Sequence, residues 1–478
     1  MKEYDVIAIG TGSVMHIIDG MIQRDPETKA AVIDKDEAGG ICMTRGCIPS
    51  KILLYSAEVV RTIQRADVFG IDAKIEKVDF AQVMGRMRSI TDADIERIEM
   101  ALTHSENIDY YHDEARFVAP YTMGVAGETI HSELILLGAG SEPTIPPIDG
   151  LEDIGYLTSD TFLHITELPE SVAVVGGGYI AAEYGHFLAA MGAEVTILGR
   201  NPQFLPKEEP EISALAKQEL EKHMTILTNH EVRSVREEGG LKHLVAFDRE
   251  SEEERTIRAH EILVAAGRGP TAYRLHPDEA GIETDSRGWI VVDEHLQTSQ
   301  PNIYALGDAT GHLQFKHKAN YEATVVYYNA VLEHEVHPDY HAVPHAVFTY
   351  PEVAGVGLRE REAIDEIGED KVAIGVYLYR DTAKGEAMGI EEDLFAKIIL
   401  ERETYRILGA HIIGPHASIL IQEVVSLMYT EEGSALPIIN GMHIHPALSE
   451  VVERALWSFF TPGEYRHMLH ERYDFIVE

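Results

Sequence analysis

The sequence is poor in cysteine, in basic residues and in long apolar runs. Two cysteines among 478 residues are too few for a fold held together by disulfides. Lysine and arginine number 40 against 80 aspartate and glutamate residues, and the formal net charge of −40 should repel nucleic acid and anionic membrane surfaces. No apolar run approaches membrane-spanning length, and the first residues lead into a strand pattern without the apolar segment of a signal peptide. We therefore expect a cytoplasmic protein that has no nucleic-acid or membrane partner.

The rest of the composition is typical of a folded globular chain. Hydrophobic residues make up 45% of the sequence, which is ample for packed cores, and this length predicts roughly two to four domain units. In a cytoplasmic chain, a single pair of cysteines is more often catalytic than structural. The two cysteines are therefore the first candidates for chemistry.

Both cysteines lie in residues 39–51, which read GGICMTRGCIPSK. In a continuous helix, residues five apart are separated by about 8.6 Å between Cα atoms, beyond the roughly 7 Å that a disulfide can bridge. If Cys42 and Cys47 pair, a helix must begin between them. Gly46 permits the backbone to turn there, and Pro49 suits a first helical turn.

Cys47 would then lie at a helix N-terminus, where unpaired amides favour a thiolate, and neighbouring Arg45 would add a positive charge. Two buried, unreactive cysteines would show the same spacing. The spacing alone therefore leaves a redox pair and a structural pair both open.

Residues 4–34 have the order of a dinucleotide-binding unit. An apolar strand ends in Gly10-Thr11-Gly12, a helical pattern follows, and a second short strand ends at Asp34. Amides at the helix N-terminus would hold a diphosphate, and the acid would accept hydrogen bonds from ribose hydroxyls. Met15 stands where such turns usually have a third glycine, and many glycine turns bind nothing.

Residues 171–200 repeat this pattern more completely, with a turn Gly176-x-Gly178-x-x-Ala181 between a strand and a helix. Two such units in one chain predict two bound dinucleotides. The second strand ends in Gly199-Arg200, where a site for NADH would have a carboxylate; an arginine there favours the 2′-phosphate of NADPH. A solvated surface arginine is the alternative.

From residue 344 onward, the chain changes to short strands and helices without a glycine turn, which predicts an antiparallel sheet with flanking helices. His445-Pro446 is followed by Glu450. A histidine has a pKa near neutrality, and a carboxylate can fix its tautomer and stabilise its charged form. With 24 histidines in the chain, any one of them is by default a packing or surface residue.

These motifs, in this order, resemble the FAD-dependent pyridine nucleotide-disulfide oxidoreductases, the relatives of dihydrolipoamide dehydrogenase, glutathione reductase and mycothione reductase. The pattern Gly-Gly-x-Cys-x4-Cys-x-Pro-Ser-Lys carries the resemblance most specifically, and the resemblance covers nearly the whole chain. It implies an α/β fold with two Rossmann-like dinucleotide-binding domains, for FAD and NAD(P), and a C-terminal α+β dimerisation domain. The implied boundaries are 1–145 (first part of the FAD domain), 146–268 (NAD(P) domain), 269–343 (second part of the FAD domain) and 344–478 (dimerisation domain).

The resemblance also implies a role for individual residues. Cys47 would face the flavin and Cys42 would exchange with substrate; Lys51 would pair with Glu183 beside the flavin. His445 and Glu450 would form an acid-base pair that reaches the site of the partner in a homodimer. The implied FAD residues are Gly10, Gly12, Asp34, Gly40, Gly140, Asp308 and Ala309. The implied NAD(P) residues are Gly176, Gly178, Tyr179, Arg200 and Gly267, with Tyr179 either a lid over the nicotinamide or a packing aromatic; no metal site is predicted.

The substrate is less defined than the chemistry. Dihydrolipoamide dehydrogenase is the commonest member of the family, so a lipoyl domain or a small thiol is the first expectation. Arg200, the opening Gly-Thr-Gly-Ser and the ending His-Pro-Ala-Leu-Ser-Glu-Val-Val-Glu instead favour an NADPH-dependent reductase of a low-molecular-weight disulfide, such as a mycothione or glutathione reductase.

Two further alternatives are weaker. Mercuric reductase is disfavoured because its extra C-terminal cysteines are absent. A flavoprotein subunit that only binds within a larger complex is the alternative outside the enzymes. Arg45 replaces a small apolar residue usual in the family, and we expect it either to lower a thiol pKa or to attract an anionic substrate.

Overall fold

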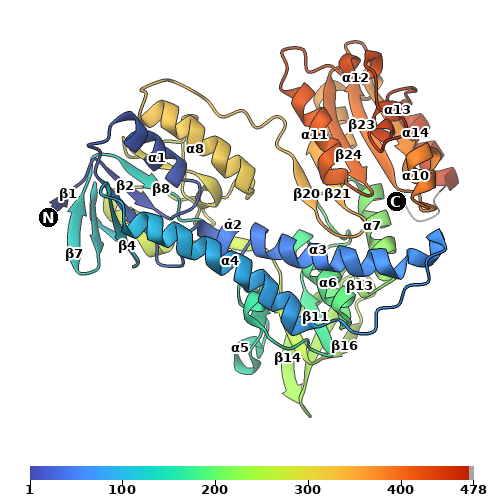
Figure 1. Ribbon diagram of the computed structural model, residues 1–478, viewed down its shortest axis with the longest axis horizontal. Helices are drawn as coiled ribbons and strands as arrows, with labels where there is room; N and C mark the ends of the chain where they lie inside the picture. Colours follow the sequence, from blue (N-terminus) through green and yellow to red (C-terminus); the bar gives the residue numbers. More distant parts are fainter. Residues whose placement is uncertain (473–478) are drawn as a thin grey trace.

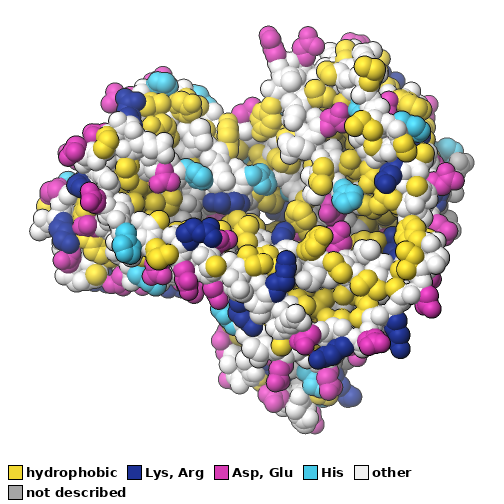
Figure 2. Space-filling model, viewed as in Figure 1, with side chains coloured by type: hydrophobic (Ala, Val, Ile, Leu, Met, Phe, Trp, Pro, Cys, Tyr) yellow, Lys and Arg dark blue, Asp and Glu magenta, His cyan; other side chains and the backbone are white. Residues whose placement is uncertain are grey.

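The computed structural model describes residues 1–472 and arranges them in three lobes, each built on a five-stranded sheet (Figure 1). Helices α3 (Cys47–Gln64) and α4 (Phe80–Thr103) run across the middle of the molecule. No helix in this part of the chain is long and apolar enough to cross a membrane. Acidic side chains are scattered over the face in Figure 2 rather than gathered in one patch.

The first lobe contains a parallel sheet of strand order β19-β8-β2-β3-β4. Its strands are β2 (Val6–Ile9), β3 (Ala30–Ile33), β4 (Ile108–Tyr111), β8 (Ile135–Leu137) and β19 (Ile303–Ala305). β2 and β3 are buried throughout, as expected for a parallel sheet covered on both faces. Helices α1 (Met15–Arg24) and α8 (Lys316–Ala330) pack on it. Two helices that are about 300 residues apart in the sequence therefore cover the same sheet.

The second lobe repeats this design with strand order β10-β17-β11-β12-β13, again all parallel. Its strands are β10 (Leu157–Thr158), β11 (Ser171–Val175), β12 (Glu194–Leu198), β13 (Thr225–Leu227) and β17 (Glu261–Val264). Helices α6 (Tyr179–Met191) and α7 (Pro210–Glu221) belong to this lobe. The duplication predicted from the two glycine turns is therefore present as two parallel sheets.

The third lobe holds the antiparallel sheet β20-β21-β24-β23-β22, as the change of sequence pattern predicted. Its strands are β20 (His345–Val347), β21 (Val353–Gly357), β22 (Val372–Leu378), β23 (Phe395–Glu401) and β24 (Ile407–Ile413). Its helices are α9 (Glu360–Ile367), α10 (Ala383–Ala387), α11 (Ala417–Met428), α12 (Leu436–Asn440), α13 (Glu450–Ala455) and α14 (Pro462–Arg472). The predicted fold class is confirmed, whereas the residue boundaries between domains stay a prediction.

Smaller sheets complete the first two lobes. They are β1-β7-β6-β5, β14-β15-β16 and the pair β18-β9. Their strands are β1 (Lys2–Glu3), β5 (Arg116–Ala119), β6 (Thr122–Val125), β7 (Glu128–His131), β9 (Ser141–Pro143), β14 (His230–Glu238), β15 (Leu241–Asp248), β16 (Glu254–Ala259) and β18 (Arg268–Pro270). The remaining α-helices are α2 (Gly40–Thr44) and α5 (Leu151–Ile154).

Apolar side chains in residues 52–105 recur at helical spacing on more than one face of the helices formed there. Tyr55 and Val59 have the spacing of core positions, yet they are 62% and 44% exposed. The buried stripe of α3 instead contains Leu53 and Ala57, which pack into the same core as α6. A helix with apolar residues on more than one face does not reveal from spacing alone which face meets its neighbour.

Candidate active site

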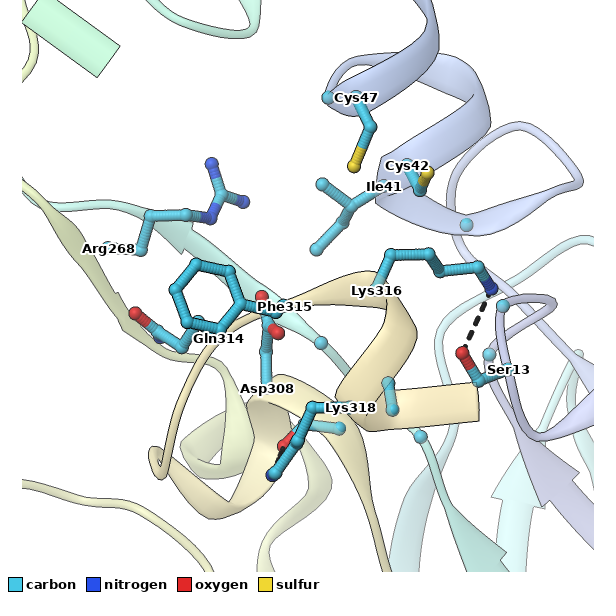
Figure 3. A pocket seen from close by; sticks show the side chains of 18 of the residues that line it. Ser13, Ile41, Cys42, Cys47, Arg268, Asp308, Gln314, Phe315, Lys316 and Lys318 are labelled. Atoms are coloured by element: carbon cyan, nitrogen blue, oxygen red, sulfur yellow. Dashed lines mark hydrogen bonds between the residues drawn. The ribbon is translucent and has the colours of Figure 1, made fainter. Parts of the chain in front are cut away.

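A cavity of about 1120 Å³ opens beside the carboxyl ends of the strands of the first sheet (Figure 3). Ligand sites in open parallel sheets lie at this edge. All three lobes contribute to its wall, because Gly10, Glu183 and His345 come from the first, second and third lobe. Of the predicted site residues, those that line it are Gly10, Gly12, Asp34, Gly40, Cys42, Cys47, Lys51, Gly140, Tyr179, Glu183 and Asp308.

The two thiols lie side by side on this wall. Cys42 belongs to α2, and Cys47 is the first residue of α3, so the predicted helix start between the two cysteines is present. Both are free cysteines, and Cys47 is exposed at the cavity. A Cβ at Gly46 would meet the carbonyl oxygen of Ile41 at 2.8 Å, so the tight turn that joins the two helices requires glycine.

The two thiols differ in acidity. The hydrogen bond from Cys42 lowers the pKa of Cys47 to about 7, and the positive charge of Lys51 adds to this effect. The same interaction, together with burial, raises the pKa of Cys42 well above its usual range. One thiolate at Cys47 beside a protonated Cys42 is therefore the favoured state of the pair near neutral pH.

Lys51 is held over the cavity by an ion pair with the second lobe. Its Nζ donates to both carboxylate oxygens of Glu183, at 2.8 and 3.0 Å. The amide of Phe348 also donates to Glu183, at 3.0 Å, and the ring of Phe348 lies 4.9 Å from Nζ. The predicted Lys51–Glu183 pair is thus present, and it joins all three lobes at this point.

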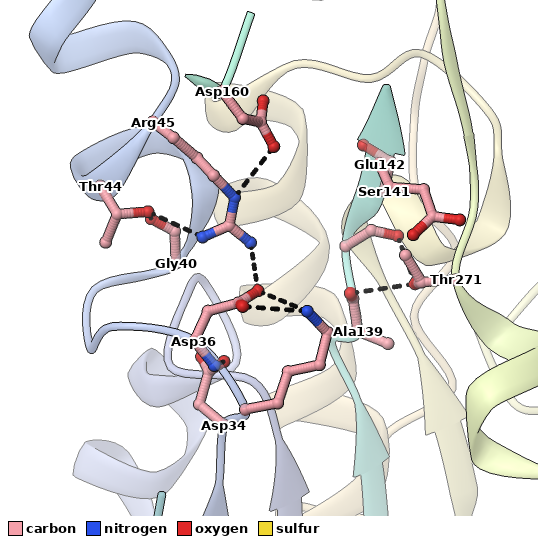
Figure 4. Close-up of polar contacts among 12 residues, drawn as sticks. Asp34, Asp36, Gly40, Thr44, Arg45, Ala139, Ser141, Glu142, Asp160 and Thr271 are labelled. Atoms are coloured by element: carbon pink, nitrogen blue, oxygen red, sulfur yellow. Dashed lines mark hydrogen bonds and ion pairs between the residues drawn. The ribbon is translucent and has the colours of Figure 1, made fainter. Parts of the chain in front are cut away.

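Arg45 does not act on the thiols as the sequence suggested (Figure 4). Its guanidinium pairs with Asp36 at 2.5 Å and with Asp160 at 3.3 Å. The cations that act on the thiols are two lysines rather than Arg45. The charge of Lys51 lowers the pKa of Cys47, and the charge of Lys316 offsets part of the rise in the pKa of Cys42. The first of the two roles expected for Arg45 is therefore wrong, because its charge is neutralised by two carboxylates from other segments.

The glycine turn of the first lobe lets two segments approach each other closely. A Cβ at Gly10 would meet the carbonyl oxygen of Gly138 at 2.4 Å, and one at Gly40 would meet the Cα of Gly12 at 2.7 Å. Asp34 accepts hydrogen bonds from the amide and hydroxyl of Thr11, at 2.8 and 2.6 Å. The acid is thereby fixed at the end of β3, next to the turn.

A second carboxylate, Asp308, faces the same cavity from the start of the 3₁₀ helix Gly307–Thr310. The hydroxyl of Ser141 donates to it at 2.6 Å, and Arg268 donates to that hydroxyl at 2.7 Å. Ala309, the next residue in the chain, is buried, and neither Ala309 nor Gly267 lines the cavity.

Lys316 is a cation that the sequence analysis did not single out. The lysine and arginine residues that line the cavity are Lys35, Arg45, Lys51, Arg268, Arg274, Lys316 and Lys318. All except Lys316 have a carboxylate within ion-pair distance in the part of the chain that the structure describes. The ammonium of Lys316 donates to the hydroxyl of Ser13 at 2.9 Å, beside the first glycine turn (Figure 3). Burial lowers the pKa of Lys316, while the two thiols and Asp308 partly offset this effect.

The glycine turn of the second lobe lies outside this cavity. Gly176 has φ 142°, and a Cβ there would meet the carbonyl oxygen of Ala265 at 2.1 Å. Gly178 precedes α6, whose first residue, Tyr179, lines the cavity and is 38% exposed. The second nucleotide unit therefore reaches the dithiol cavity through α6, whose Glu183 and Tyr184 line the cavity together with Tyr179.

Arg200 is exposed just beyond β12, and within residues 1–472 its side chain makes no hydrogen bond or ion pair. Arg249, also exposed, donates from its guanidinium to the backbone oxygen of Arg200 at 2.9 Å. Two guanidinium groups therefore lie at the end of this strand. Sequence reasoning missed Arg249 because it comes from a distant turn with no motif of its own.

His445 and Glu450 form the predicted pair, but outside the cavity of their own chain. The Nδ1 of His445 and the Oε1 of Glu450 are 3.0 Å apart, and the His445 side chain is 65% exposed. Burial would raise the pKa of Glu450, but hydrogen bonds from His445 and from the Ala447 amide, together with the charge of Arg454, hold that pKa below its usual value. Arg454 lies 2.7 Å from the same Oε1, a contact that the sequence analysis missed.

Comparisons with known proteins agree with this arrangement. The family model for pyridine nucleotide-disulphide oxidoreductases matches residues 4–323, and the model for their dimerisation domain matches residues 343–456. Mycothione reductase of Mycobacterium tuberculosis is 36% identical over 95% of this chain and 99% of its own length. Dihydrolipoyl dehydrogenase of Chlamydia muridarum is 34% identical over 96% of this chain and 98% of its own length.

Solved structures give the same assignment. The HOCl-induced flavoprotein disulfide reductase RclA from Escherichia coli superposes with a TM-score of 0.84 at 26% identity, covering 95% of this chain and 100% of that chain. The matched dimerisation domain supports a homodimer. The chain therefore belongs to the pyridine nucleotide-disulphide oxidoreductases, flavoproteins that use FAD and NAD(P)H.

Proposed function

We propose that this protein is an NADPH-dependent reductase of a low-molecular-weight disulfide. The observation that carries the proposal is Arg200 at the end of β12, which is exposed and has no carboxylate partner within residues 1–472. The guanidinium of Arg249 donates to its backbone oxygen. A 2′-phosphate is attracted by such a pair of arginines, whereas the ribose hydroxyls of NADH are recognised by an acid at this position. Since NADPH serves reduction, this preference favours a disulfide as the physiological substrate.

The cavity fits FAD. Its glycine turn suits backbone contact with a diphosphate, and the acid Asp34 suits a ribose. The ammonium of Lys316, which has no carboxylate partner among the described residues, suits the diphosphate charge, and the carboxylate of Asp308 suits the ribityl hydroxyls. When bound, FAD supplies the transfer of an electron pair between the nicotinamide and the Cys42–Cys47 disulfide. Lys51, held by Glu183, would stand beside its ring.

The thiols would act in sequence once the pair is reduced. The sulfur of Cys42, after loss of its proton, attacks the substrate disulfide, forms a mixed disulfide and releases one thiol. The thiolate of Cys47 then attacks the sulfur of Cys42, which closes the Cys42–Cys47 disulfide and releases the second thiol. One electron pair from NADPH reopens that disulfide, so one NADPH and one proton convert one disulfide into two thiols.

Proton transfer would fall to His445. The raised pKa of Cys42 means that its proton must be removed before attack, and an imidazole supported by a carboxylate is suited to this task. His445 does not line the cavity of its own chain, and its side chain is largely exposed. We propose that in the homodimer it completes the partner's cavity.

Dihydrolipoamide dehydrogenase is the second candidate. The named relative at 34% identity favours it, and the thiol chemistry would be the same in the opposite direction. In that case NAD would be the acceptor, and a lipoyl group would exchange with Cys42.

The deciding experiment is a steady-state screen of purified holoenzyme, with NADPH and NADH against lipoamide, glutathione, mycothione-type and coenzyme A disulfides. We expect kcat/KM to favour NADPH, and Arg200→Ala together with Arg249→Ala to remove that preference without reducing activity with NADH. Lys217, a half-buried lysine of α7 that pairs with Glu221, gives a charge-loss control far from this strand end. Preference for NADH with dihydrolipoamide would select the second candidate; flavin reduction without turnover of any disulfide or dithiol would indicate a binding subunit.

A further inference from the structure

Two histidines and a glutamate meet on the first lobe, outside the dithiol cavity. Glu294 and His295 belong to the turn before β19, and His337 belongs to the long connection from α8 to β20 (Figure 1). One ligand atom from each residue lies within 4.8 Å of the others. We propose that Glu294, His295 and His337 form a binding site for one transition-metal ion of the Zn²⁺ type.

The donor atoms are close to the spacing that such an ion requires. The carboxylate of Glu294 lies 3.7 Å from the Nδ1 of His337 and 3.9 Å from the Nε2 of His295. Metal–nitrogen bonds of about 2.0–2.1 Å in a tetrahedron place ligand atoms about 3.3 Å apart. Rotation of side chains that are partly solvent-exposed can close this difference, and a fourth position would be left for water.

The two segments that carry the donors are fixed to each other by a buried amide. Asn329 donates from Nδ2 to the backbone oxygens of His295, at 3.1 Å, and Val336, at 2.8 Å. Its Oδ1 accepts from the amide of Val336 at 2.8 Å. The backbone next to His337 is thereby held beside the turn of His295, and the two imidazole rings are 4.5 Å apart between centroids. Such preorganisation reduces the entropy that binding would cost.

The turn of Glu294 and His295 is rigid as well. The carboxylate of Asp293 accepts from the amides of His295, at 2.8 Å, and Gln297, at 2.9 Å. Because these bonds are internal to the turn, its side chains project from a fixed backbone. A metal ion would thus be bound by a prepared surface rather than by two mobile loops.

The donor set selects the class of ion. Two imidazoles and one carboxylate suit Zn²⁺, Co²⁺, Ni²⁺ or Cu²⁺, whereas Mg²⁺ and Ca²⁺ prefer oxygen ligands only. The net charge of −40 also raises the local concentration of cations around the protein.

The position of the site suggests what a bound ion would do. Glu294 and His337 lie at the wall of a second cavity, of about 540 Å³, which Tyr340 and Glu322 also line. The segment that carries His337 leads to the third lobe. A bound ion would tie this connection to the first lobe and would raise the temperature at which the protein unfolds.

The test uses the full-length holoenzyme with its Cys42–Cys47 disulfide formed and verified by thiol titration, because a free dithiol would itself bind these ions. Zn²⁺ binding is measured by competition with a chromophoric chelator, and Co²⁺ binding by its visible absorption. We expect one strong site per chain, weakened at least tenfold in His337→Ala and in the gentler His337→Gln. His334→Ala is the matched control, since His334 is exposed on the same connection and stacks on Tyr328.

Thermal unfolding supplies an independent readout. Zn²⁺ should raise the unfolding midpoint of the unmodified chain and of His334→Ala, and should leave His337→Ala unchanged. Far-ultraviolet dichroism and FAD content confirm that each variant is folded. Absence of a saturable site, or equal binding by the unmodified chain and both His337 variants, would overturn the proposal.

Discussion

Replacing Lys316 with Met should weaken the binding of FAD. Lys316 is the one cavity-lining cation without a carboxylate partner in the described part of the chain, and its ammonium lies 2.9 Å from Ser13, next to the first glycine turn. A buried cation without a counter-ion is costly, and the diphosphate of FAD would supply the missing negative charge. Met keeps the length and apolar stem of the side chain and removes the charge, together with the hydrogen bond to Ser13.

The size of the effect can be bounded. Two unit charges about 4 Å apart interact by about 4 kcal/mol at an effective dielectric constant near 20. Mutation of a hydrogen bond to a charged group usually costs about 1.5–3 kcal/mol, because part of the Coulomb energy is offset by desolvation. We therefore expect the Kd of FAD to rise about 10- to 150-fold.

The assay removes FAD from each variant and follows its rebinding by quenching of flavin fluorescence. Lys35→Met is the matched control, since Lys35 lines the same cavity but is already paired with Asp36 at 2.8 Å. Lys316→Arg should retain most of the affinity. An unchanged Kd in Lys316→Met would refute the reasoning, and a rise in thiol pKa without loss of FAD would instead assign Lys316 to Cys42, whose pKa its charge lowers.

Three further predictions concern the thiols and the acid-base pair. Cys42→Ala removes the hydrogen bond that lowers the pKa of Cys47, so the midpoint of its alkylation rate against pH should rise from about 7 toward the ordinary thiol value; a midpoint still near 7 would contradict this cause. Arg45→Ala should leave that midpoint unchanged, because two carboxylates already neutralise the guanidinium; a clear rise would show that its charge does reach the thiolate. Arg454→Met removes a positive charge that helps to hold the pKa of Glu450 below its usual value, so the pKa of Glu450 should rise and its carboxylate should support His445 only at higher pH. The acidic limb of the profile of kcat/KM against pH should then move to higher pH, and Arg454→Lys should bring it back to the position of the unmodified chain. If the limb does not move in Arg454→Met, Arg454 contributes packing only.

Local features of the chain were predictable because their causes lie close together in sequence. The helix start at Cys47 follows from Gly46 and Pro49 a few residues away, and each glycine turn is contiguous with its strand and helix. The parallel sheets follow from the fully apolar strands that alternate with helices.

Contacts between distant segments were not predictable in the same way. Arg45 was assigned to the thiols because they are its sequence neighbours, but Asp160 from the second lobe competes for its charge. Lys316 and Ser13 are 303 positions apart in the sequence, and no sequence pattern predicts their hydrogen bond. The charge environment of the dithiol is therefore a property of the folded chain rather than of its motif.

The exposure of His445 has a consequence for how activity is divided between two chains. If the other subunit contributes this imidazole to each cavity, a chain that lacks Cys47 and a chain that lacks His445 are both inactive as homodimers. In a mixed dimer of these two chains, both defects fall on the same cavity and the other cavity is intact. Mixing the two inactive proteins under conditions that allow subunit exchange would then restore turnover. A monomer with a complete site of its own could not show this behaviour.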